Sequence, residues 1–173
     1  IVRRDPGSGI LSYFHSMSVL SRFYTAFAAR DVPRMAECYS DKAHYSDPAF
    51  GSLNAEEVRA MWAMLVSRSA DLRITFAILS EDERSGSCEW HARYTFTGTG
   101  RSVHNVIRSE FVLRNGLIVH QRDRFDFWRW SRQALGMPGH LLGWSPIIRV
   151  GVRRSARAAL ARHMARMKSP ERS

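Results

Sequence analysis

The chain has 173 residues, and its 26 Lys and Arg against 16 Asp and Glu give a formal net charge of +10. The length suits one domain, and 45% hydrophobic with 11% aromatic residues excludes a chain that is disordered throughout. No apolar stretch is long enough to predict a transmembrane helix. Cys38 and Cys88 form neither a zinc pattern nor a disulfide framework, so we expect free thiols in a reducing, cytoplasmic compartment.

The positive charge is concentrated at the C-terminal end, where residues 149–173 carry seven of the ten net charges. The rest of the chain is close to neutral, which disfavours nucleic acid as the partner of the domain. Residues 146–173 predict a basic amphipathic helix or tail, with an apolar side formed by Val152, Ala156, Ala159, Leu160 and Met167. Three uses of this segment stay open: docking on the domain, contact of residues 149–168 with an anionic membrane surface, or contact with nucleic acid.

The first half of the chain has the patterns of helices. Residues 1–15 predict a loose leader that need not belong to the natural protein. A helix is predicted over 16–29, and Asp31 is expected to cap a short helix that reaches about residue 39. Asn54 and Glu57 form a capping-box pattern that predicts a third helix, to about residue 67.

After Asp71 the apolar residues alternate with polar ones, which is the period of β-strands. Turn residues separate four predicted strands, at about 72–78, 88–96, 102–113 and 117–127. Because helices come first and an antiparallel meander follows, the predicted class is α+β. One domain is expected, over residues 16–145, followed by the basic tail.

The hairpin formed by the last two strands has two candidate registers. A two-residue loop of Asn115 and Gly116 mixes charged and apolar side chains on both faces, whereas a three-residue loop with Gly116 in the left-handed conformation separates them. We therefore prefer the second register, which pairs Ser109 with Gln121 and Ile107 with Asp123. It places four polar side chains on the buried face: Asn105, Ser109, Gln121 and Asp123.

An inward-facing carboxylate at Asp123 has two interpretations. It either satisfies backbone groups and ordered water, or acts as a general acid or base whose pKa is set by apolar surroundings. Tyr45 and Asp47 are two residues apart on an extended segment, so both face the same way. Asp47 precedes Pro48 and has the alternative role of a turn residue that caps local backbone.

These helices and strands resemble the SnoaL-like branch of the nuclear transport factor 2-like superfamily, which includes ketosteroid isomerase and limonene-epoxide hydrolase. The resemblance covers about residues 17–145 and ends in Arg122-Asp123-Arg124-Phe125-Asp126. It implies a curved antiparallel sheet that is wrapped with three helices into a cone, whose interior is a ligand pocket. It also implies a homodimer, which we expect to form through the outer face of the sheet.

Compared with ketosteroid isomerase, Asp47 stands at the position of the proton-shuttling carboxylate. The two oxyanion-hole positions fall on Phe23, with Tyr24 one position off, and on Ser109. The resemblance thus implies that the base position is kept while the oxyanion hole is not.

Compared with limonene-epoxide hydrolase, Asp123 matches the water-activating Asp and Tyr45 the water-positioning Tyr, while Asp47 replaces an Asn. The Arg and Asp that complete that site fall on Trp90 and Ala92, so the acid that opens the epoxide is missing. The polyketide cyclases of the SnoaL type need only a pocket carboxylate and no cofactor.

These observations predict a protein that binds a small hydrophobic molecule, as a cofactor-independent acid/base enzyme of the isomerase, cyclase or hydrolase kind. The alternatives are a non-catalytic ligand-binding or dimerisation module, and a membrane-surface protein that uses its basic tail. Asp123, Asp47 and Tyr45 are the catalytic candidates, and no His triplet has the spacing of a metal site. Seven residues are expected to contact the ligand: Phe23, Trp62, Trp90, Asn105, Ser109, Gln121 and Phe125.

Overall fold

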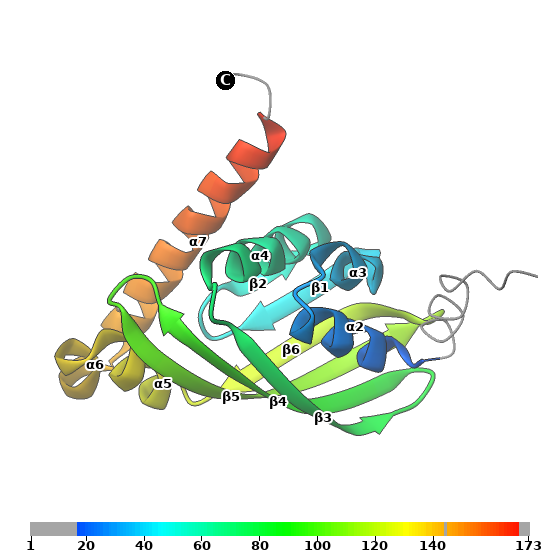
Figure 1. Cartoon of the computed structure of the whole chain (residues 1–173), viewed down its shortest axis with the longest axis horizontal. Helices are drawn as coiled ribbons and strands as arrows, with labels where there is room; N and C mark the ends of the chain where they lie inside the picture. The colour runs from blue at the N-terminus through cyan, green and yellow to red at the C-terminus, as the bar shows by residue number, and fades with distance from the viewer. Residues whose placement is uncertain (1–16, 144, 170–173) are drawn as a thin grey trace, which may run out of the picture.

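The computed structural model describes residues 17–143 and 145–169, so the predicted leader at 1–15 lies outside the described residues. Figure 1 shows a curved sheet with helices in its concave side and a long C-terminal helix that rises from one end. The helices are α2 (Val19–Ala28), α3 (Val32–Glu37), α4 (Ala55–Arg68), α5 (Phe127–Leu135), α6 (Met137–Leu142) and α7 (Pro146–Lys168). The strands are β1 (Tyr39–Asp47), β2 (Gly51–Asn54), β3 (Arg73–Glu81), β4 (Ser85–Phe96), β5 (Arg101–Arg114) and β6 (Leu117–Phe125).

The six strands form one sheet in the order β2-β1-β6-β5-β4-β3. The predicted α+β class and cone are confirmed, with one difference, because β1 pairs with β6 in parallel and the sheet is therefore mixed. All other pairs are antiparallel. No hairpin links β1 to β6 along the chain, so no turn constrains their relative direction.

The predicted helix caps are present at both α3 and α4. The Asp31 side chain accepts a hydrogen bond from the Arg34 amide at the start of α3. Asn54 and Glu57 form a capping box at the start of α4, each side chain bonded to the other residue's backbone amide. These caps satisfy amides that a helix start leaves without partners, and so fix where α3 and α4 begin on the concave face.

The predicted register of the β5–β6 hairpin is wrong, although the faces that it assigned are right. The loop is the two-residue Asn115-Gly116 turn, and both residues have positive φ. A bulge at Val119 then shifts the pairing, so that Ser109 lies opposite Asp123. The bulge adds one residue to β6 and restores the alternation that keeps Gln121 and Asp123 on the buried side.

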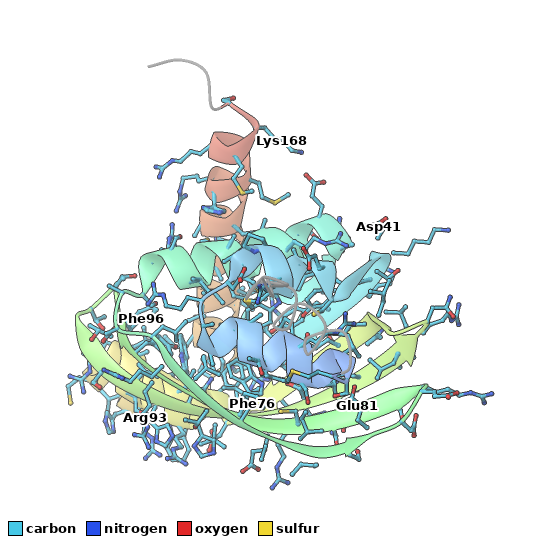
Figure 2. The ribbon with its side chains drawn as sticks, turned by 45° about the vertical axis from the view of Figure 1, so that its right-hand side comes forward. Asp41, Phe76, Glu81, Arg93, Phe96 and Lys168 are labelled. Atoms are coloured by element: carbon cyan, nitrogen blue, oxygen red, sulfur yellow. The ribbon has the colours of Figure 1, made fainter. Side chains whose placement is uncertain are left out.

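Side-chain alternation separates the two faces of the sheet. Figure 2 shows Phe96 and Glu81 at opposite ends of the β3–β4 hairpin, with Arg93 on the convex side. Exposed ion pairs cross the strands on that side, between Arg108 and Glu89 and between Arg124 and Glu110. The concave side carries the apolar core, which also includes α2 and α4.

The basic segment forms α7, and this helix docks on the domain. Ala159 and Leu160 are buried in the main core, and Ala156 and Met164 pack against it. The Arg157 guanidinium pairs with Glu57 on α4 at 3.2 Å. Within the part of the chain that the structure describes, neither α7 nor any other helix is both long and apolar enough to cross a bilayer.

Candidate functional site

A cavity of about 770 Å³ lies between the concave face of the sheet, α4 and the first half of α7. Most of its lining is aromatic or aliphatic, as the residues Phe27, Trp62, Leu65, Trp90, Ile107, Phe125, Trp130, Ile148, Val152 and Ala156 illustrate. Asp47, Tyr45, Asn105 and Asp123 place polar groups in this apolar wall. A large apolar cavity with a few converging polar groups is typical of a small-molecule site.

Asp123 is held by hydrogen bonds from three side chains and is 3% exposed. Its Oδ1 accepts from the Ser109 hydroxyl at 2.6 Å and from the Gln121 side-chain amide at 2.9 Å. Its Oδ2 accepts from the Tyr45 hydroxyl at 3.0 Å. Because β1, β5 and β6 are neighbours in the sheet, this carboxyl is positioned by the strand pairing itself.

The Ser109 hydroxyl is the centre of the first supporting arm. It accepts from the Trp90 indole N–H at 2.8 Å and from the Tyr24 hydroxyl at 3.1 Å, and it donates its one hydrogen to Asp123. A serine hydroxyl offers one donor and two acceptor lone pairs, so Ser109 has no capacity left for a ligand. Its role here is to orient Asp123.

Gln121 is the centre of a second arm. Its side-chain oxygen accepts from the Tyr39 hydroxyl, whose oxygen in turn accepts from the Trp62 indole N–H at 2.9 Å. The donor at Tyr39 fixes which end of the Gln121 amide faces Asp123, so the NH₂ group must donate to the carboxyl. Both arms therefore present hydrogen-bond donors to Asp123, which favours its ionised form.

Tyr45 lies between the two acids. Its hydroxyl oxygen is 3.0 Å from Asp123 Oδ2 and 3.1 Å from Asp47 Oδ2. The hydroxyl has one hydrogen, so both contacts are full hydrogen bonds only when one of the two carboxyls is protonated. The geometry of the series Asp47–Tyr45–Asp123 is therefore suited to one further proton, carried by either acid.

The electrostatics agree with this proton count. Burial raises the pKa of Asp123 from 3.8 to about 7, against the lowering effect of its bonds from Ser109 and Gln121. Burial also raises the pKa of Asp47, although the Phe50 amide and the Tyr45 hydroxyl donate to it. The pKa of Tyr45 is raised well above its ordinary value, chiefly by burial, so it stays protonated as the donor between them.

Six of the seven expected ligand contacts either line the cavity or lie directly behind it. Trp62, Trp90, Asn105 and Phe125 line the cavity, as do the three catalytic candidates. Ser109 and Gln121 do not line it and lie behind Asp123 instead, because their polar groups are used to hold the carboxyl.

The ligand contact expected at Phe23 is not found, because Phe23 is fully buried and does not line the cavity. Its ring packs edge-on against Tyr24, Tyr39 and Trp62, and of these three only Trp62 lines the cavity.

The sequence reasoning missed the supporting roles of two tyrosines and the part that α7 plays in the cavity. Tyr24 and Tyr39 support Ser109 and Gln121 through their hydroxyl groups, and no sequence pattern marks them, since both also serve as core aromatics. The sequence did contain a pattern that indicates the contribution of α7 to the cavity, namely the apolar side of the basic segment. Ile148, Val152 and Ala156 recur every four residues, and all three line the cavity.

Metal chemistry has little support in the same residues. Among the described residues, no group of three His, Cys, Asp or Glu side chains is arranged to hold a metal ion. His91 and His104 form a pair, with ring nitrogens 3.1 Å apart, but they lie among the charged groups of the outer face.

Together the cone and its cavity define a domain with the nuclear transport factor 2-like fold. The chain belongs to the SnoaL-like domain family, whose model matches residues 20–121, more than half of its length. Asp47 and Tyr45 lie inside the matched segment and Asp123 lies just beyond it. No curated protein matches the chain.

Solved structures share this fold at low sequence identity. A candidate polyketide cyclase from Silicibacter sp. TM1040 is 22% identical with a TM-score of 0.59, over 66% of this chain and 91% of that one. A protein of ketosteroid isomerase-like fold from Catenulispora acidiphila, in complex with trimethylamine, is 12% identical with a TM-score of 0.60, over 72% of this chain and 96% of that one. An epoxide hydrolase from M. tuberculosis, similar to limonene-epoxide hydrolase, is 15% identical with a TM-score of 0.53, over 68% and 86%.

Proposed function

We propose that the protein is a cofactor-independent acid/base enzyme that acts on a small hydrophobic molecule, of the isomerase, cyclase or hydrolase kind. The observation that carries this proposal is the hydrogen-bonded series Asp47–Tyr45–Asp123 in the wall of an apolar cavity. Two carboxyls that share one proton through a hydroxyl supply a base and an acid in the same site.

In this mechanism Asp123 is the base. With a pKa of about 7 it is substantially ionised near neutral pH and still basic enough to accept a proton from a bound substrate or from water. As the substrate bond to hydrogen breaks and Asp123 becomes protonated, the protonated Asp47 gives its proton to the substrate at a second atom. Tyr45 then passes its hydroxyl proton to Asp47 and takes one from Asp123, so the enzyme ends as it began.

The arrangement differs from that of a steroid isomerase at one point. Ser109, at an oxyanion-hole position in the resemblance, gives its hydrogen to Asp123 and is 1% exposed. Phe23, at the other position, has no donor. Negative charge that develops on a substrate oxygen must therefore be stabilised by the protonated acid of the pair. This favours reactions in which that acid donates its proton as the charge develops.

The test uses a reporter reaction that needs a buried base and is accelerated by a proton donor beside the leaving oxygen. In nitrobenzisoxazole a carboxylate removes the ring C–H proton while the N–O bond breaks, which releases a coloured cyanophenolate. We expect catalysis by the wild type, and a loss of about a hundredfold or more in Asp123→Asn and in Asp47→Asn. Glu110→Gln, an exposed carboxyl on the convex face, is the matched control and should keep full activity. Full activity in both cavity variants would refute the acid/base mechanism.

A non-catalytic ligand carrier is the second candidate, and the size and apolar lining of the cavity favour it. Native mass spectrometry of gently purified protein separates the two. A carrier retains one hydrophobic molecule unchanged in both wild type and Asp123→Asn, whereas an enzyme retains substrate in Asp123→Asn and product or nothing in the wild type. The identity of that molecule also decides among isomerase, cyclase and hydrolase.

The expected assembly and compartment form part of the proposal. We propose a homodimer through the convex face, where the cross-strand ion pairs and the exposed Val112 offer a surface for a second copy. Sedimentation velocity tests it, since Val112→Glu should convert a dimer to a monomer. The free and buried thiols of Cys38 and Cys88 support a reducing, cytoplasmic compartment.

A further inference from the structure

One end of the molecule gathers large exposed apolar side chains on three short segments. Trp128, Met137, Leu141, Ile147 and Val150 have exposed fractions between 44% and 80%, and we call this set the apolar end. Figure 1 shows α5, α6 and the start of α7 grouped at one end of the sheet. Exposed apolar groups concentrated in this way mark an interaction surface more often than scattered single residues do.

Two of the segments that carry the apolar end, α5 and α6, pack closely together. A Cβ added to Gly139 on α6 would lie 2.0 Å from the Ser131 carbonyl oxygen of α5, and one added to Gly143 would lie 2.1 Å from the Ser131 hydroxyl. Only glycine permits such close contact between α5 and α6. Trp128, Met137 and Leu141 are therefore displayed from two closely packed helices.

A cluster of arginines lies beside the apolar end. Arg101, Arg129 and Arg132, with Gln133 and His140, line a hollow of about 310 Å³. Arg132 lies over the Trp128 ring at 4.4 Å, and Arg101 donates to the Gln133 carbonyl. Within the described residues no carboxylate forms an ion pair with any of these three arginines, whereas Arg108 and Arg124 on the convex face are paired with Glu89 and Glu110. Unpaired charge here attracts an anionic partner.

The combination favours one kind of partner. Tryptophan and bulky aliphatic groups beside arginines are typical of proteins that lie at the boundary between headgroups and acyl chains of an anionic membrane. A nucleic acid would use the arginines but would gain little from exposed Met137, Leu141 and Ile147. We propose that the apolar end and its arginine cluster dock on the surface of a bilayer that contains anionic phospholipids.

This docking face differs from the membrane contact expected over residues 149–168. The second half of α7 is used within the molecule, since Leu160 is buried in the core and Lys168 pairs with Glu56 on α4. The first turns of α7 contribute instead, together with α5 and α6. Ile147 and Ile148 also line the cavity, so docking would bring the rim of the cavity to the membrane. Binding is independent of turnover, so it can fail or succeed separately from the proposed enzyme activity.

The test is flotation of the full chain with vesicles of phosphatidylcholine, with and without phosphatidylglycerol, at low salt. We expect binding to the anionic vesicles, much weaker binding to the neutral ones, and release as salt is raised. Ile147→Asp should reduce the partition about tenfold. Arg129→Gln should reduce it about fivefold, because one arginine near an anionic surface contributes on that scale. Matched controls are Leu79→Glu, an apolar residue of β3 that is 59% exposed, and Arg114→Gln, an exposed arginine of β5.

A second measurement compares the tryptophan fluorescence of the wild type with that of one conservative variant, Trp128→Phe. Brominated lipids in anionic vesicles should quench the tryptophan fluorescence of the wild type more than that of Trp128→Phe. The proposal is overturned if anionic and neutral vesicles bind equally. It is also overturned if the controls lose as much binding as Ile147→Asp and Arg129→Gln, or if the same arginine supports retention on single-stranded RNA while vesicle binding is unchanged.

Discussion

The floor of the cavity and the wall formed by α7 are held in different ways. At the floor, Asp123 receives hydrogen bonds from Ser109, Gln121 and Tyr45, each from a strand of the sheet. At the wall, α7 is held by a few apolar contacts and by exposed bonds of Arg153 and Arg157 to the β1–β2 region and α4. The floor is therefore a preorganised polar network, whereas the wall is a separate element laid across it.

The floor and the wall should therefore respond differently to substitution. In a buried network the loss of one partner leaves other polar groups without bonds, so effects spread. In a wall fixed by exposed contacts, each loss is small and stays local. Substitutions at the floor should thus alter chemistry and stability together, while substitutions at the exposed contacts that hold α7 should alter mainly the mobility of that helix.

The largest expected effect is on the pH dependence of stability in Asp123→Asn. The folded-state pKa of Asp123 is raised from 3.8 to about 7 by burial, so the folded state retains a proton that the unfolded state releases. The free energy of unfolding should fall as pH rises from about 4 to about 7, and it should stay at that lower value above pH 7. The contribution is on the order of a few kcal/mol. Asn keeps the shape, accepts from Ser109 and Gln121, and should remove this slope.

Thermal melts from pH 4 to pH 8 give the measurement, and Asp82→Asn gives the control. The backbone amides of Arg84 and Ser85 lower the pKa of exposed Asp82, so its contribution has the opposite sign and is lost as pH falls. A wild type whose stability rises steadily between pH 4 and pH 7, with Asp123→Asn behaving identically, would contradict the buried-acid interpretation.

Tyr45→Phe should have the next largest effect, on proton transfer. The change removes the hydroxyl between Asp47 and Asp123 and leaves the ring in place. Turnover of nitrobenzisoxazole should fall about a hundredfold, because Asp123 loses its route for returning the proton. Tyr94→Phe is the matched control, since Tyr94 also lines the cavity and its hydroxyl contacts Trp130 rather than an acid. Equal activity in the two variants would argue against a relay.

The fold was predictable from the sequence because its signals are local. The capping residues Asp31 and Asn54 and the change of period after Asp71 mark the elements directly. The register of the last hairpin was not predictable from the sequence, because a bulge at Val119 depends on which side chains the whole sheet buries. The same parity argument nevertheless identified Asp123 as inward-facing, because a shift by two residues leaves the faces unchanged.

The site was only partly predictable. Asp47, Tyr45 and Asp123 were found from alternation and resemblance, and they do meet in the structure. The supporting roles of Tyr24 and Tyr39 were not found, because a hydroxyl that bonds to a partner 85 or 82 residues away has no pattern along the chain. Contacts of that kind appear only once the sheet has placed distant strands side by side.

Ser109→Ala should have a smaller effect on both stability and chemistry. It removes a donor to the ionised Asp123 and leaves the Trp90 N–H and the Tyr24 hydroxyl without their acceptor. Unfolding free energy should drop by about 1–3 kcal/mol. The pKa of Asp123 should rise, so the acid limb of the pH–rate profile for nitrobenzisoxazole should move to higher pH. Ser131→Ala, a buried serine that donates only to the Trp128 carbonyl, should leave that limb unchanged.

The smallest effect is expected for Arg157→Ala at the wall. Arg157 pairs with Glu57 at 3.2 Å and donates to the Ser52 carbonyl at 2.9 Å, and both contacts are partly exposed. The global unfolding free energy should change by about 1 kcal/mol or less. Amide hydrogen exchange is the sensitive readout, because amides of α7 should exchange faster while those of β5 and β6 keep their protection. Arg154→Ala removes an exposed arginine of the same helix and should change neither. If β5 and β6 lost protection together with α7, the wall and the floor would form one cooperative unit, because opening of α7 would then require the strands that hold Asp123 to open as well.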